Sequence, residues 1–88
     1  MNQEIKGIQF TKIVGDGFVN SEFFPMSHAQ IASFQSDAQK PENKGDEITV
    51  DLADASGNIF DDFSISDGFA EFAMSRMGVH WIYPTIYP

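Results

Sequence analysis

Residues 46–71, with the sequence DEITVDLADASGNIFDDFSISDGFAE, decide the fold of this 88-residue chain. Near their start Ile48, Val50 and Leu52 alternate with polar residues. Alternation with a period of two is typical of a half-buried antiparallel strand, so the sequence predicts a strand over 47–53 with one wet face.

A turn and a partner strand follow. Ser56-Gly57-Asn58 is a turn-forming triplet, and residues 59–65 form the predicted partner strand. Its alternation falters at Asp61-Asp62, because Phe60 and Phe63 are three residues apart. A β-bulge would reconcile this spacing with pairing.

A helix is predicted next, with Ser66 or Asp67 at its N-cap and Gly78 at its C-terminal end. One helical stripe contains Phe69, Phe72, Ala73 and Met77, and the large apolar residues of this helix, Phe69, Phe72, Met74 and Met77, are expected in the core.

The N-terminal half repeats this arrangement in form. Residues 4–14 alternate like a strand, Gly15-Asp16-Gly17 predicts a turn, and residues 18–24 form the predicted return strand, which Pro25 ends. A capping box of Ser27 and Gln30 then opens a helix predicted over 28–39.

The fold class predicted is α+β: a two-layer sandwich with an antiparallel sheet, two helices on one face and the order β-β-α-β-β-α-(β). The chain forms one domain of two hairpin-helix units, 4–40 and 47–78. A polar linker at 40–46 is the expected mobile loop, and an aromatic tail at 79–88 contains a short final strand.

Composition restricts the function. The chain has no cysteine, which excludes disulfides and thiolate metal sites, and fits a reducing cytoplasm. Residues 1–10 lack a basic segment followed by an apolar run, so we expect no signal peptide, and no stretch approaches 18 apolar residues. A formal net charge of −8 argues against direct binding to nucleic acid or to an anionic membrane, and permits binding to a basic protein surface.

The negative charge is concentrated in one third of the chain. Residues 46–71 contain eight Asp and Glu residues and no Lys, Arg or His. In the rest of the chain, five acidic residues are balanced by five basic ones. Solubility alone could account for it, but a surface that serves only solubility more often mixes the signs. The acidic face predicted to bind a partner comprises Asp46, Glu47, Asp51, Asp54, Asp61, Asp62, Asp67 and Glu71.

Strand geometry places part of this face. Asp51 is expected to project outward with Glu47 and Thr49, and Asp61 or Asp62 to lie beside it across the ladder. Like charges directly opposite each other on paired strands lower the stability of the fold. A row of carboxylates of this kind also resembles the phosphates of a nucleic-acid backbone in sign and spacing.

Metal and catalytic alternatives are weaker. Placing Gly57 at the sixth position of a calcium loop puts Leu52 and Phe63 where the first and last ligands belong. A looser divalent site could use Asp54, Asp61 and Asp62. No residue is marked as a catalytic acid, so we expect no enzyme, no cofactor and no metal.

The two histidines and the aromatic tail remain. His28 and His80 lack a third ligand spaced as in zinc motifs, and are expected to be structural or on the surface. The tail contains Trp81, Tyr83 and Tyr87, which either complete the core or offer an aromatic contact to a partner.

In its architecture and composition, the stretch from Ile48 to Met77 resembles the small acidic inhibitors that phages and mobile elements use against host defence, anti-CRISPR proteins among them. The resemblance implies a non-enzymatic inhibitor in the bacterial cytoplasm. Its acidic face would mimic DNA and fill a basic site on a nucleic-acid-binding defence protein, such as a CRISPR effector.

Two alternatives remain open. One is a small phage or accessory protein that forms homodimers or larger homo-oligomers through the aromatic tail and exposed apolar residues. The other is a divalent-metal-binding domain.

Overall fold

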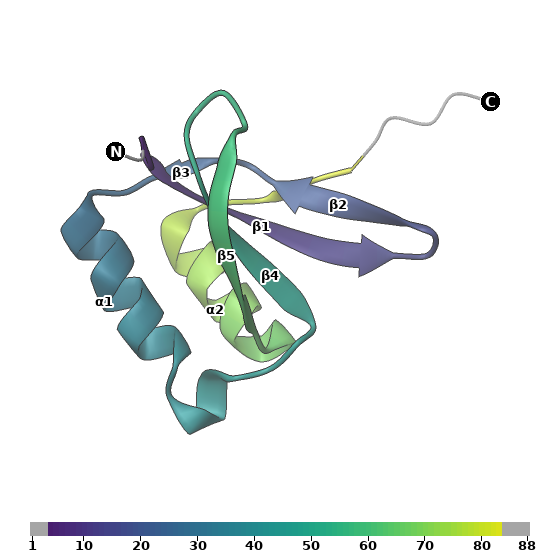
Figure 1. Ribbon diagram of the computed structural model, residues 1–88. Helices are drawn as coiled ribbons and strands as arrows, with labels where there is room; N and C mark the ends of the chain where they lie inside the picture. The colour runs from purple at the N-terminus through teal and green to yellow at the C-terminus, as the bar shows by residue number, and fades with distance from the viewer. Residues whose placement is uncertain (1–3, 84–88) are drawn as a thin grey trace.

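The computed structural model describes residues 4–83 and has the predicted α+β architecture, with an antiparallel sheet and two helices packed on one of its faces (Figure 1). The main path of the six-stranded sheet runs β5-β4-β1-β2-β6, and β3 also pairs with β1. The elements are β1 (Gly7–Val14), β2 (Gly17–Ser21), β3 (Phe24–Pro25), α1 (His28–Ala38), the 3-10 turn η1 (Pro41–Asn43), β4 (Ile48–Ala53), β5 (Ile59–Ile65), α2 (Asp67–Met77) and β6 (Trp81–Ile82).

The β4–β5 hairpin confirms the strands and the bulge predicted from the opening stretch. Ile48 pairs with Ile65 and Leu52 with Asp61, whereas Ala53 pairs with Ile59, so Phe60 is the extra residue on β5. The bulge explains why the two strands keep their pairing although the alternation of β5 falters.

The return strand predicted over 18–24 is interrupted. Thr11 pairs with Asn20 and Ile8 with Phe24, which leaves one extra residue on the returning segment between β2 and β3. At this second bulge the Phe10 amide donates to the Ser21 hydroxyl over 2.8 Å in place of a backbone carbonyl. Pro25 is the last residue of β3, where its missing N–H is tolerated.

Both helices begin as predicted. Ser27 and Gln30 form the capping box of α1, which ends one residue earlier than expected. Ser66 is the N-cap of α2, and its hydroxyl accepts from the Phe69 amide. Gly78 ends α2 with φ 72°, a left-handed conformation that costs glycine little.

The linker contains η1, an element that its polar composition did not predict. The Asn43 side chain donates to the Asp37 carbonyl over 2.8 Å, and the Asn43 carbonyl accepts from the Ser66 amide over 2.9 Å. Gly45 packs against Ser66, where an added Cβ would lie 2.6 Å from its Cα atom. These contacts bind the linker to the ends of both helices.

The core lies between the helices and one face of the sheet. Its largest fully buried side chains are Phe10, Ile8, Ile65 and Val50. Phe34 of α1 lies at its centre, with ring centroids 5.6 Å from Phe69 and 6.1 Å from both Phe10 and Phe63. Aromatic pairs at these separations add to the stabilisation from burial itself.

The expected core stripe of α2 is wrong at one position. Phe72 is 57% exposed, and the Arg76 guanidinium lies 5.4 Å from its ring centre. Ala70, Ala73 and Met74 are the buried residues instead. Phe72 is two residues from both Ala70 and Met74, which is about 200° around the helix axis, so it lies on the side of α2 opposite these buried residues.

The final strand is confirmed as β6, which pairs with β2. Trp81 packs against the core and Tyr83 is exposed, so this part of the tail both completes the core and presents an aromatic side chain. Lys12 lies 4.5 Å from the Trp81 ring centre and donates to the Tyr83 hydroxyl. Tyr87 lies outside the described residues. No helix in the described part is long and apolar enough to cross a membrane.

Candidate functional site

The predicted acidic face divides into separate groups in space. Five exposed carboxylates lie on β5, which is the edge strand of the sheet, or at the base of the β4–β5 hairpin. We call this group the acidic edge; it comprises Asp46, Glu47, Asp61, Asp62 and Asp67.

At the base of the hairpin the acids meet a helix N-terminus. The Glu47 carboxylate accepts from the Asp67 backbone amide over 3.2 Å, and Asp67 is the first residue of α2. The first amides of a helix lack intrahelical partners and carry partial positive charge. The helix therefore offsets part of the repulsion between these two carboxylates.

On β5 the acids protect a strand edge. The Asp61 side chain accepts from the Asp62 amide over 2.8 Å, so this amide is already occupied by a local acceptor. Charged side chains on edge strands oppose pairing with other strands. Both carboxylates remain exposed.

Asp54 has a structural role in the turn. Its carboxylate accepts from the Ser56 amide and from both the amide and the side chain of Asn58, at 2.9–3.0 Å. These hydrogen bonds, led by the one from the Asn58 side chain, lower the pKa of Asp54 below its ordinary value of 3.8. The Asp54 carboxylate is therefore occupied by hydrogen bonds within its own turn.

The expectation that Asp51 lies on a wet face is wrong. Its side chain is on the sheet face without helices, directly opposite Asp62 as predicted, but Asp51 is only 5% exposed. The Thr11 hydroxyl donates to Asp51 Oδ2 over 2.6 Å and the Gln9 amide over 3.4 Å. The neighbouring strands bury the Asp51 side chain, because the twist of the sheet brings the β1–β2 and β4–β5 hairpins together around it.

Glu71 also lies apart from the acidic edge. It is exposed on α2 and lines a hollow with Trp81 and His80 on the β6 side of the helix.

Charge segregation persists in three dimensions. The ion pairs of residues 4–83 are Lys6–Glu4 and Lys40–Asp37 at 3.4 Å, and the contact of His80 with Glu22 at 3.4 Å. Each uses an acid from outside the opening stretch. The carboxylates of the acidic edge therefore have no basic side chain as a partner in the described part of the chain.

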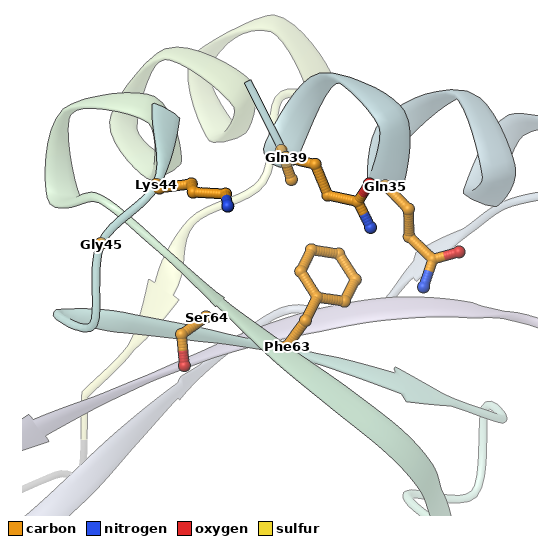
Figure 2. Close-up of a pocket in the computed structure, with 7 residues that line it drawn as sticks. Gln35, Gln39, Lys44, Gly45, Phe63 and Ser64 are labelled. Atoms are coloured by element: carbon orange, nitrogen blue, oxygen red, sulfur yellow. The ribbon is translucent and has the colours of Figure 1, made fainter. Parts of the chain in front are cut away.

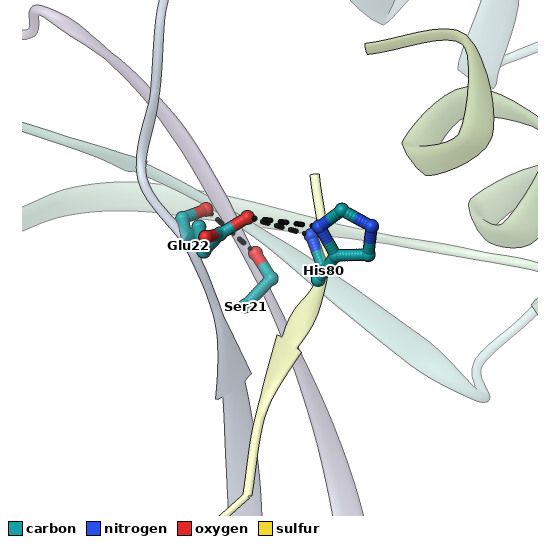
Figure 3. A network of polar contacts seen from close by, with 3 residues as sticks. All are labelled: Ser21, Glu22 and His80. Carbon is teal, nitrogen blue, oxygen red and sulfur yellow. Dashed lines mark hydrogen bonds and ion pairs between the residues drawn. The ribbon is translucent and has the colours of Figure 1, made fainter. Parts of the chain in front are cut away.

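The geometry offers little for metal or acid–base chemistry. Among the described residues, no three His, Asp or Glu side chains come together as a metal site would require. Both histidines are exposed: His28 Nε2 lies 3.2 Å from the Ile5 carbonyl, and His80 contacts Glu22 through its backbone amide and its ring (Figure 3). The contacts between His80 and Glu22 join the start of β6 to the bulge that follows Ser21.

A hollow of about 200 Å³ lies between the C-terminal end of α1 and β5 (Figure 2). Gln35 and Gln39 extend toward it from the helix, and Phe63 and Lys44 line it from the other sides. It adjoins the acidic edge, and its polar rim and single ring make it a shallow contact area for a partner rather than a closed site.

A second groove, of about 500 Å³, lies on the sheet face that bears Asp51. Its lining residues are Gln9, Thr11, Ile13, Phe18, Asn20, Asp51, Gly57 and Ile59. Among these residues, only Asp51 was predicted from the sequence to belong to a functional site. The alternation along residues 4–14 could have predicted that Gln9, Thr11 and Ile13 share one face of a strand. It could not have predicted that this face lies beside the β4–β5 turn.

Comparisons of the chain with protein-family models, curated proteins and solved structures find no match.

Proposed function

We propose that this protein is a non-enzymatic binding protein whose acidic edge docks on a basic protein surface. The observation that supports this most is that none of the five edge carboxylates has a basic partner in residues 4–83, whereas Glu4, Glu22 and Asp37, outside residues 46–71, each have a Lys or His within 3.4 Å. Unrelieved like charge costs folding stability, so its retention on one strand edge favours a role in recognition.

The partner proposed is a nucleic-acid-binding protein of a host defence system, such as a CRISPR effector, which the acidic edge would inhibit by occupying its nucleic-acid site. β5 supports this geometry, since Asp61 and Asp62 project from an extended edge whose seven residues span about 20 Å. A negatively charged rod of this length is suited to a groove that holds a nucleic-acid backbone.

Capture with DNA competition tests the proposal. The immobilised protein is incubated with bacterial lysate at low salt, and bound proteins are eluted with duplex DNA. We expect DNA to release a nucleic-acid-binding protein that a variant with Asp61→Lys and Asp62→Lys fails to retain.

A matched control is the double variant Asp16→Lys and Glu71→Lys, which changes the net charge equally at exposed positions apart from the acidic edge. It should retain the captured protein. Equal retention by both double variants would show that binding does not use the acidic edge, and elution by salt but not by DNA would exclude nucleic-acid mimicry.

A further inference from the structure

The groove on the face of Asp51 combines a polar floor with apolar walls. Gln9, Thr11, Asn20 and Asp51 form the floor, and Ile13 and Phe18 of the β1–β2 hairpin face Gly57 and Ile59 of the β4–β5 hairpin. Ile13 is 75% exposed, Phe18 63% and Ile59 51%. Convergent polar groups between apolar walls are the usual composition of a binding site.

Asp51 is a buried carboxylate without a cation. The residues that line the groove include no Lys, Arg or His, and the two donors to Asp51 are a neutral hydroxyl and a neutral amide. Burying a carboxylate without an opposite charge is costly. Asp62 directly across the ladder adds a second negative charge to the same face.

One oxygen of Asp51 is open to the groove. Both hydrogen bonds reach Oδ2, and none reaches Oδ1 among the described residues. No fully buried side-chain oxygen lacks a partner in this part of the chain, so Oδ1 keeps some solvent-accessible surface. Its exposure on a residue that is otherwise buried directs it into the groove.

Asn20 supplies a second acceptor next to Asp51. The Thr11 hydroxyl lies 2.6 Å from Asp51 Oδ2 and 2.8 Å from the Asn20 side-chain oxygen, but it has only one proton. The bond to the carboxylate is charge-assisted and therefore stronger. The Asn20 oxygen has two lone pairs, so at least one stays available to a ligand beside Asp51.

We propose that this groove binds an arginine side chain of the protein's partner. A guanidinium offers several donors in one plane, which suits two neighbouring acceptor groups, and its flat face can stack on Phe18. Its aliphatic stem would pack against Ile13 or Ile59. The assignment rests on the proposed function and deepens it, because it supplies a specific contact for the same basic partner.

The test uses N-acetylargininamide as the probe and the neutral N-acetylcitrullinamide as its matched control, each titrated into the 15N-labelled full chain. We expect saturable amide shifts at Thr11, Asn20, Asp51 and Gly57 with the arginine probe only. Asp51→Asn should weaken binding about tenfold, as expected for a charged hydrogen bond, and Asp16→Asn should not.

Phe18→Ala gives an independent result if Asp51→Asn does not fold, because Phe18 is exposed and outside the core. It should weaken binding about threefold, the size of a cation–π contribution. Shifts confined to the acidic edge, equal shifts with the citrulline probe, or unchanged affinity in the folded variants would overturn the groove assignment.

These outcomes are separable from those of the proposed function. Loss of partner capture in the Asp61/Asp62 reversal, together with a groove that ignores the arginine probe, would refute the groove alone. Specific binding of arginine in the groove, with capture insensitive to that reversal, would refute the acidic edge alone.

Discussion

At the residue scale, acids that are equivalent in the sequence have different roles in the structure. Asp51 is buried, Asp54 holds its own turn, and Asp61 and Asp62 are exposed on the edge strand. The sequence placed Asp51 on the correct side of its strand, because alternation determines the side. It could not give the burial, which depends on how strongly the sheet twists and on distant Thr11 and Gln9.

Asp54→Asn should destabilise the protein at neutral pH. The turn hydrogen bonds lower the pKa of Asp54 in the folded state, so ionised Asp54 stabilises folding above pH 3.8, and this contribution is lost as pH falls below that value. Urea unfolding at pH 7 and at pH 3 measures the effect.

The stability difference between wild type and Asp54→Asn should therefore shrink at pH 3. Asp16→Asn is the control, since the Asp16 side chain makes no hydrogen bond with other described residues. A difference that is absent at pH 7, or that grows in acid, would contradict the role assigned to Asp54.

At the element scale, local sequence chemistry predicted most of the fold. The capping residues Ser27 and Ser66, the terminal Gly78 and the bulge in β5 all follow from residue types and spacing. The second bulge at Ser21 did not, because it depends on a side-chain acceptor for the Phe10 amide. The alternation of residues along one strand does not reveal a contact such as that between Phe10 and Ser21, which lie eleven residues apart.

Gly7 is predicted to be essential where β1 passes β3. An added Cβ would collide with the Phe24 carbonyl oxygen and lie 2.8 Å from both the Phe23 ring and the Pro25 Cα atom. Backbone cannot move aside cheaply, so Gly7→Ala should lower the free energy of unfolding by about 2–3 kcal/mol. Chemical denaturation measures this loss.

Gly17→Ala is the matched control, because nothing lies within 4 Å of the Cβ it would add. It should change the free energy of unfolding by less than about 0.5 kcal/mol. Equal effects of the two substitutions would show that the close approach at Gly7 does not constrain the fold.

At the scale of the whole molecule, one core joins both helices to one face of the sheet (Figure 1). The carboxylates of the acidic edge lie outside this core, on β5 and at the base of its hairpin. The order of the predicted strands and helices predicted this two-layer architecture. The helical stripe could not separate Phe69 from Phe72, since both fit its spacing. The choice between them depends on where α1 places Phe34.

Phe34→Ala should lower the free energy of unfolding by about 3–5 kcal/mol, because it removes the ring that joins α1 to Phe10, Phe63 and Phe69. Phe72→Ala deletes the same atoms from an exposed position and should cost less than about 1 kcal/mol. Denaturant unfolding of the two variants measures both changes in the free energy of unfolding. A large loss on Phe72→Ala would mean that α2 is rotated from the packing described.

The central claim is that the acidic edge docks on a basic surface. Its most direct test is the association rate with the captured partner, measured in low and high salt for the wild type, the Asp61/Asp62 reversal and the Asp16/Glu71 reversal. Electrostatic docking predicts that the edge reversal slows association at least tenfold in low salt, more than the control does, and that this difference shrinks as salt screens the charges. Equal rates for the two reversals at low salt would contradict the account.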